Sequence, residues 1–136
     1  MRKVFIALLL SAVVAAPLSA QESRDQAIQS LINDQIAALQ ADDFTTAFSF
    51  ASPTIQGLFG NSENFGAMVR QGYPMVYRPK SVRMLGVRED GGLVWQRVMV
   101  TDRAGATHLL DYQLVKTPEG WLINAVQLLP QSGVAA

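Results

Sequence analysis

The chain has 136 residues, which is enough for one domain. It contains no cysteine, which excludes disulfide bonds and lipid anchors attached through cysteine. Eleven basic and eleven acidic side chains leave it formally neutral, whereas a domain that binds nucleic acid is usually strongly basic. We therefore expect no nucleic-acid partner.

Residues 1–20 have the three-part layout of a secretory signal peptide. Two basic residues follow the first Met, residues 4–16 form an apolar run, and small residues precede Gln21. The run is shorter than the ~20 residues that a membrane-spanning helix needs. We expect cleavage near Gln21 and a periplasmic or secreted protein of a Gram-negative bacterium, without membrane contact after cleavage. A retained amphipathic or buried helix is the alternative.

Charge is unevenly distributed after residue 20. Residues 21–65 contain one Arg against six acidic residues, and residues 66–103 contain seven basic residues against three acidic ones. The two segments can pack together and neutralise each other. Alternatively, the basic segment forms a surface for an anionic ligand.

Residues 23–41 have the pattern of one amphipathic helix. Ser23 and Gln26 have the spacing of a capping box. The residues that follow at helical spacing are apolar with one exception. They are Ile28, Leu31, Ile32, Gln35 and Leu39.

Asp42 and Asp43 stand where a second helix needs an N-cap. A carboxylate there accepts the free backbone N–H groups of the first turn and interacts favourably with the helix dipole. The apolar residues that follow share one helical face; they are Phe44, Ala47, Phe48 and Ala51. Adjacent carboxylates at a helix start do not converge on one point, as an acid–base pair must. The pattern therefore favours capping over catalysis.

Two shorter helices are expected next. Pro53 starts the first, because Pro at the first helical position loses no hydrogen bond, and Gly60 ends it. The second starts at Asn61 or Ser62 and cannot continue past Pro74. Its apolar residues are Phe65, Met68 and Val69.

Four strands are predicted after Pro79, at residues 81–88, 93–101, 107–116 and 121–129. They are rich in β-branched, aromatic and long apolar residues, and hairpin-type turn sequences separate them. The predicted fold is α+β, with N-terminal helices packed on a curved four-stranded antiparallel sheet. Residues 21–130 form the single domain, and residues 131–136 are expected to be a flexible tail.

The strand faces depend on the loop lengths. If each hairpin loop has two or four residues, Trp95 and Tyr112 share a face with Trp121. Because this face carries the larger aromatic side chains, we expect it to pack against the helices. An odd-length loop would break the alternation. The candidate ligand-binding residues of this face are Trp95, Arg97, His108 and Tyr112.

Arg97 is the residue of that face that most needs a partner. A guanidinium among Trp, Tyr and Leu side chains requires a carboxylate or an anionic ligand. A helix acid, namely Asp42, Asp43 or Glu63, can supply the carboxylate, or the side chain can reach the sheet edge. The alternative is an anionic small molecule bound on the helix-facing side.

The opposite face of the predicted sheet carries a polar row among apolar side chains. The row consists of Gln96, Asp111, Gln113 and Asn124. These side chains can pair across strands within one chain. They can also form a wet, self-complementary homodimer interface.

The sequence gives little support for metal or nucleophilic chemistry. His108 is the only histidine, and without cysteine or clustered acids a zinc or transition-metal site has almost no ligands. We expect no metal and no cofactor. Asp111 lies three residues from His108 and so on the other strand face, which argues against a His–Asp pair between these two residues. The hydrolase Gly-x-Ser-x-Gly motif and the phosphate-binding glycine loops are also missing, so no catalytic residue is assigned.

Residues 47–56 and 65–73 read AFSFASPTIQ and FGAMVRQGY. They resemble a family of small exported proteobacterial proteins known as domain of unknown function 4864, and the resemblance covers residues 26–129. It implies no established activity, cofactor or catalytic residue.

The order of elements also resembles the cone of nuclear-transport-factor-2-like (and SnoaL-like) proteins. Members of that fold include isomerases and dehydratases with acid–base residues inside the cone, and many non-catalytic binding or dimerisation domains. The present chain departs from the usual plan. The first strand there commonly lies between helices, and the only candidate here is the stretch 73–78, after them.

The leading hypothesis is an exported, non-catalytic domain that binds a small ligand or a partner protein. The alternative is a cone-type isomerase, dehydratase or hydrolase with His108 or an acid as general base. Such an enzyme needs a titratable group with a shifted pKa inside a closed pocket. A structural subunit that acts through a dimer face is the third hypothesis.

Overall fold

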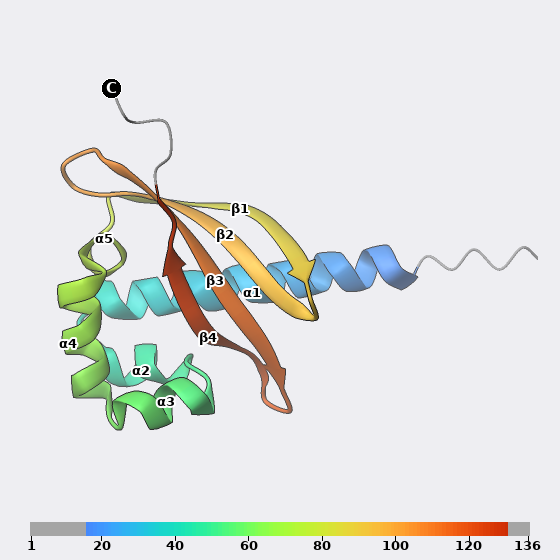
Figure 1. Cartoon of the computed structure of the whole chain (residues 1–136), viewed down its shortest axis with the longest axis horizontal. Helices are drawn as coiled ribbons and strands as arrows, with labels where there is room; N and C mark the ends of the chain where they lie inside the picture. The colour runs from blue at the N-terminus through green and yellow to red at the C-terminus, as the bar shows by residue number, and fades with distance from the viewer. Residues whose placement is uncertain (1–15, 131–136) are drawn as a thin grey trace, which may run out of the picture.

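The computed structural model describes residues 16–130 and has the predicted α+β fold, with helices followed by a four-stranded antiparallel sheet (Figure 1). The strands lie in the order β1-β2-β3-β4. The helices are α1 (Ala16–Gln40), α2 (Phe44–Ser49), α3 (Pro53–Phe59), α4 (Ser62–Gly72) and α5 (Pro74–Tyr77). The strands are β1 (Ser81–Asp90), β2 (Leu93–Thr101), β3 (Thr107–Thr117) and β4 (Gly120–Leu128).

Two of the expectations fall largely or wholly beyond the described part of the chain. Most of the expected signal peptide, residues 1–15, and the expected tail, residues 131–136, lie outside the described residues. Within residues 16–130, no helix is both long enough and apolar enough to cross a membrane.

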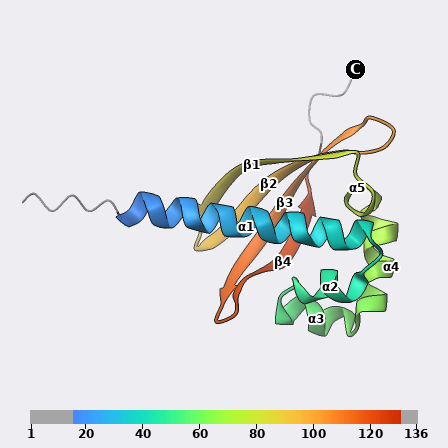
Figure 2. The ribbon, with the colours of Figure 1, turned by 180° about the vertical axis from the view of Figure 1, so that it is seen from behind.

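The helices pack on one face of the sheet. Seen from behind, α1 runs across that face, while α2, α3 and α4 gather near the C-terminal end of α1 (Figure 2). On the opposite face, which is turned towards the viewer in Figure 1, no helix of the described residues covers the strands. We call the first face the inner face and the second the open face.

The inner face carries the core. From α1, Ile28, Ile32 and Leu39 are almost completely buried, as the helical spacing predicted. Gln35, the polar residue on that stripe, is also buried, and its side-chain amide donates to the Ala47 carbonyl at 3.2 Å. The hydrogen bond satisfies the buried amide and ties α1 to α2.

The starts of α2, α3 and α4 follow the predicted capping chemistry, but the start of α1 does not. Ser23, the predicted cap, lies inside α1, which already begins at Ala16. Asp43 is the N-cap of α2 and accepts a hydrogen bond from the Thr46 backbone N–H at 3.2 Å. Ser52 caps α3 and Asn61 caps α4 in the same way. Asp42 instead adopts a positive φ of 57° between α1 and α2, a conformation that Asp tolerates better than most residues. Of the two acids, Asp43 is therefore the cap.

The predicted strand faces are wrong for β2. Thr101 pairs with Thr107, so the loop between β2 and β3 has five residues, an odd number. The odd length shifts the alternation, and Gln96 becomes the cross-strand partner of Tyr112 on the inner face. Trp95 consequently lies on the open face and does not pack against the helices.

The segment that the cone plan would make a first strand is helical. Pro74–Tyr77 forms the short helix α5 with Pro at its start. Its residues Met75 and Val76 are buried. Strand β1 follows this helix.

Candidate functional site

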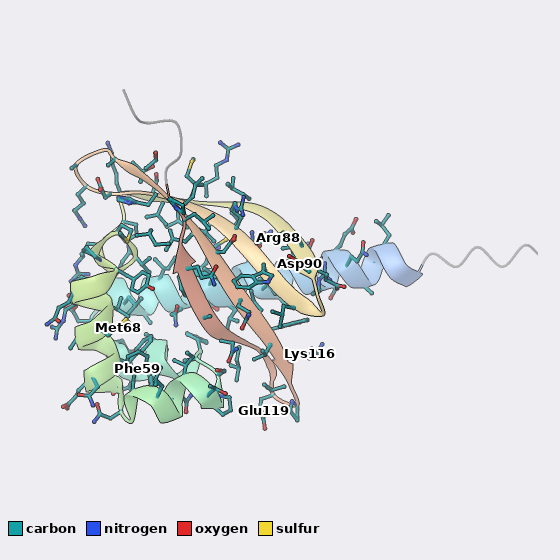
Figure 3. The ribbon with its side chains drawn as sticks, in the orientation of Figure 1. Phe59, Met68, Arg88, Asp90, Lys116 and Glu119 are labelled. Atoms are coloured by element: carbon teal, nitrogen blue, oxygen red, sulfur yellow. The ribbon has the colours of Figure 1, made fainter. Side chains whose placement is uncertain are left out.

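An apolar cavity of about 260 Å³ lies between the helices and the β4 side of the sheet. Helices α1, α3, α4 and α5 and strands β3 and β4 contribute its walls. Most of the lining side chains are apolar, and they include Leu39, Ile55, Phe59, Phe65, Met68 and Val126. Phe59 and Met68 come from the neighbouring helices α3 and α4 (Figure 3).

The cavity opens beside α3. Leu58 lines it and is nevertheless 73% exposed, and α3 has no fully buried residue. A large exposed apolar side chain at the rim of an apolar cavity is typical of the entrance to a binding site.

A short parallel bridge fixes α3 against β4. Ala51 pairs with Ile123, the Ser52 N–H donates to the Ile123 carbonyl at 2.8 Å, and the Ile123 N–H donates to the Phe50 carbonyl at 2.9 Å. The side-chain hydroxyl of Ser52 also donates to Asn124 Oδ1 at 2.8 Å. The start of α3, and with it one wall of the cavity, is thus held by the strand.

Tyr112 supplies the chemically unusual group of the cavity wall. Its side chain is fully buried, and its hydroxyl has no hydrogen-bond partner among residues 16–130. Burial raises the pKa of the Tyr112 hydroxyl far above its usual value, and nearby Tyr73 raises it further. The group therefore stays a neutral O–H, which can donate one hydrogen bond.

The other two polar side chains of the lining, Tyr73 and Gln35, each donate a hydrogen bond to a backbone carbonyl. The Tyr73 hydroxyl donates to the Val126 carbonyl at 3.0 Å, and the Gln35 amide donates to Ala47. Tyr112 is therefore the tyrosine of this cavity whose hydroxyl has no hydrogen-bond partner among residues 16–130.

The structure does not bring the four predicted ligand-binding residues together. Tyr112 lines the cavity, but Trp95 and Arg97 lie on the open face of the sheet. His108 lies at the N-terminal end of β3, where its Nε2 is 2.8 Å from Asp102 Oδ2. The hydrogen bond from His108 is the main cause that lowers the pKa of Asp102, with help from the Ala106 N–H.

Arg97 has a partner that the sequence did not suggest. It pairs with Asp111 on the adjacent strand, with Nε and one terminal nitrogen each 3.1 Å from a carboxylate oxygen. The expected helix acids, Asp42, Asp43 and Glu63, do not take this role. Arg88 of β1 binds the same carboxylate, at 3.1 and 2.7 Å.

Asp111 is charged in spite of its burial. Burial by itself would raise the pKa of this carboxyl, but the hydrogen bonds from Arg88 and Arg97 outweigh it and hold the pKa below its usual value. The pKa of Arg88 is raised, chiefly by its hydrogen bonds to Asp111. The three side chains form an ion cluster that we call the Arg–Asp–Arg cluster.

The four residues of the predicted polar row, Gln96, Asp111, Gln113 and Asn124, do not all lie on one face of the sheet. Gln96 is fully buried on the inner face, where its amide donates to the carbonyls of Leu85, Gly86 and Arg97 at the irregular part of β1. It cannot belong to an open-face dimer interface. Gln113 accepts from the Asn124 amide at 2.7 Å, so these two form a cross-strand pair within the chain. Of the row, Asp111 and Gln113 lie on the open face, and Asp111 is buried there.

Sequence reasoning missed the cavity itself. The apolar positions of α3 and α4 were visible in the sequence, but their distance from β4 depends on how the helices pack. Within residues 16–130, no group of three or more His, Cys, Asp or Glu side chains is placed to hold a metal ion.

Comparison with known proteins identifies the family. The chain belongs to the family described as domain of unknown function DUF4864, whose profile matches residues 21–136. No curated protein sequence matches the chain.

A solved structure shares the fold. The chain is similar to the solution structure of a SEC-C motif containing protein from Rhodopseudomonas palustris, with a TM-score of 0.57 and 19% sequence identity. The match covers 84% of this chain and 88% of that one. At this identity the similarity establishes the architecture alone.

Proposed function

We propose that this member of the DUF4864 family is an exported, non-catalytic domain that binds a small, mainly apolar molecule in the cavity between α3, α4 and β4. The molecule carries one hydrogen-bond acceptor, such as a carbonyl or ether oxygen, which meets the Tyr112 hydroxyl. Export rests on the signal-like pattern of residues 1–20.

The observation that supports this proposal is the unpartnered Tyr112 hydroxyl in an apolar wall. Leaving a buried polar group without a hydrogen bond costs about 1–3 kcal/mol. A ligand with an acceptor recovers this free energy when it binds, whereas a purely apolar ligand does not. The same group therefore supports binding and selects the class of ligand.

The size of the cavity limits the ligand. Sites for drug-sized molecules commonly have volumes of about 300–1,000 Å³, and this cavity has about 260 Å³. The expected ligand is a single ring or a short chain. A longer molecule would extend out of the mouth beside Leu58.

The lining supports binding more than catalysis. Its polar side chains are Gln35, Tyr73 and Tyr112, and it contains no carboxylate, imidazole or amine. A cone-type isomerase or dehydratase needs a general base within hydrogen-bond reach of its substrate. His108 lies outside this lining and is engaged with Asp102.

A matched pair of probes tests the proposal. Acetophenone and ethylbenzene are similar in size, and only the first has an acceptor oxygen. Calorimetric titration should show tighter binding of acetophenone to the wild-type chain, by about tenfold if one hydrogen bond of about 1.4 kcal/mol is gained. Native mass spectrometry of the exported protein, purified from its own cells, should detect a retained small molecule.

Two tyrosine variants provide the control. Tyr112→Phe should abolish the preference for acetophenone, because it removes the donor and keeps the ring. Tyr73→Phe should keep the preference, because the Tyr73 hydroxyl is already bonded to Val126. Binding of neither probe, or an unchanged preference in Tyr112→Phe, would refute the proposed site.

A further inference from the structure

The Arg–Asp–Arg cluster crosses three neighbouring strands on the open face. Arg88 lies on β1, Arg97 on β2 and Asp111 on β3. Each carboxylate oxygen of Asp111 receives one N–H from each arginine. Arg88 also lies over the Trp95 ring, 5.7 Å from its centroid. The position of Arg88 on the sheet is labelled in Figure 3.

The cluster carries surplus positive charge. Two guanidiniums meet one carboxylate, so the three side chains together have a charge of about +1. Arg83, whose strand neighbours Val82 and Met84 pack against the core, alternates onto the same open face. The basic segment 66–103 of the sequence therefore places three arginines here, against Asp111 and Asp90, whose charge also acts on Arg88 (Figure 3).

The two arginines keep donors for a further group. A guanidinium has five N–H donors, and each arginine uses two of them on Asp111. The side chains of Arg88 and Arg97 are 42% and 39% exposed, whereas that of Asp111 is 3% exposed. The carboxylate is thus covered by the arginines, and the remaining donors can face solvent.

The buried carboxylate also positions the donors in advance. Bidentate contacts fix the planes of guanidinium groups, and the cation–π contact of Arg88 with the Trp95 ring adds to this order. Because the side chains are already ordered, an incoming anion pays less of the entropy that flexible arginines usually lose. No helix of the described residues blocks the approach (Figure 1).

We propose that the Arg–Asp–Arg cluster is a binding site for a phosphate group on the open face of the sheet. A phosphate accepts N–H donors from Arg88 and Arg97 at once, and its charge offsets the surplus of the cluster. The site lies on the other side of the sheet from the apolar cavity, so it is independent of the ligand proposed there.

Inorganic pyrophosphate is the first probe. Titration of the wild-type chain, followed by two-dimensional NMR of the arginine Nε–H and tryptophan indole signals, should shift Arg88, Arg97 and Trp95. The signal of Arg103, in the loop between β2 and β3, should stay in place. Affinity should fall steeply with added salt. Shifts spread over all arginines, or absent at millimolar pyrophosphate, would overturn the proposal.

Charge-matched variants separate the site from net charge. Arg97→Gln should weaken pyrophosphate binding by about tenfold, and Arg103→Gln, which removes the same charge from an exposed loop, should change it by less than about twofold. Equal losses in the two arginine variants would show that binding follows net charge alone and would overturn the proposal.

A second arm identifies the source of the phosphate. Vesicles that contain phosphatidylglycerol present the group on a membrane, and neutral phosphatidylcholine vesicles are the control. A soluble phosphorylated ligand predicts pyrophosphate binding without vesicle binding. Co-sedimentation with the anionic vesicles and not with the neutral ones would identify a lipid headgroup as the source of the phosphate. Binding of neither pyrophosphate nor vesicles would overturn the proposal.

Discussion

Arg97 and Asp111 lie directly opposite each other on β2 and β3, and two hydrogen bonds of 3.1 Å join them on the open face of the sheet. This relationship accounts for a buried carboxylate on a face that no described helix covers. Arg88 binds the same carboxylate from β1. The cluster therefore links three strands as well as carrying surplus charge.

A double-mutant cycle should measure this linkage. Arg88→Met or Arg97→Met alone leaves Asp111 with one arginine, so each should cost about 1 kcal/mol of unfolding free energy. The double variant leaves a buried carboxylate without a cation and should cost about 3 kcal/mol or more, beyond the sum of the single changes. Urea denaturation at neutral pH measures all three. Simple additivity would mean that the two arginines do not share Asp111.

The same carboxylate should make stability depend on acid pH. The pKa of Asp111 is lower in the folded chain than in the unfolded chain, so its contribution is present above the unfolded value of about 3.9 and is lost as pH falls below it. Unfolding free energy should therefore decrease below about pH 4. Asp111→Asn should show a smaller decrease over the same range, and an identical acid profile would argue against the ion cluster.

Most of the elements could be predicted from the sequence, because local signals determine them. Capping residues and proline fix the starts of α2, α3 and α4, and the four strands match the predicted segments closely. The start of α1 was predicted at Ser23, seven residues after its first residue, Ala16. The strand faces could not be predicted in the same way. They depend on the five-residue loop after Thr101, in which Asp102 accepts hydrogen bonds from the N–H groups of Ala104 and Ala106.

The length of the loop between β2 and β3 determines which of the candidate residues lie on the same face of the sheet. A change of one residue in loop length moves a whole strand from one face to the other. Arg97 was predicted on the inner face and lies on the open face, whereas Tyr112 lies on the inner face as predicted. The cavity was still less predictable, because it depends on the spacing between α3, α4 and β4 and not on any local pattern.

Two helical glycines offer a test of packing near the cavity. A Cβ built at Gly66 of α4 would lie 2.6 Å from the Phe44 ring, whereas a Cβ at Gly57 of α3 would meet nothing within 4 Å. Gly57→Ala should stabilise the chain by up to about 1 kcal/mol, because Ala favours helix. Gly66→Ala should destabilise it, because the rigid ring must move. Thermal unfolding compares the two, and equal effects would contradict the close contact between α2 and α4.

Tyr112→Phe should leave the empty protein as stable as the wild type or slightly more stable. The change removes a buried hydroxyl that has no partner, and it leaves the ring that fills the inner face. Most buried tyrosines lose stability on this change because a hydrogen bond is lost. Tyr73→Phe is the matched control and should lose about 1 kcal/mol, since its hydroxyl bonds the Val126 carbonyl.

The same hydroxyl should also affect stability at alkaline pH. Burial raises the pKa of Tyr112 in the folded chain, so this phenol stays neutral there and ionises only after unfolding, above about pH 10. Unfolding releases that proton, and stability therefore falls as pH rises past this value. Ultraviolet titration of the folded wild type should leave the Tyr112 phenol un-ionised until the chain unfolds. Tyr112→Phe should remove that late step and flatten the alkaline loss of stability. Ionisation of Tyr112 in the folded chain would mean that solvent reaches it, and the cavity would then lack the dry, unpaired donor on which the proposed ligand selection depends.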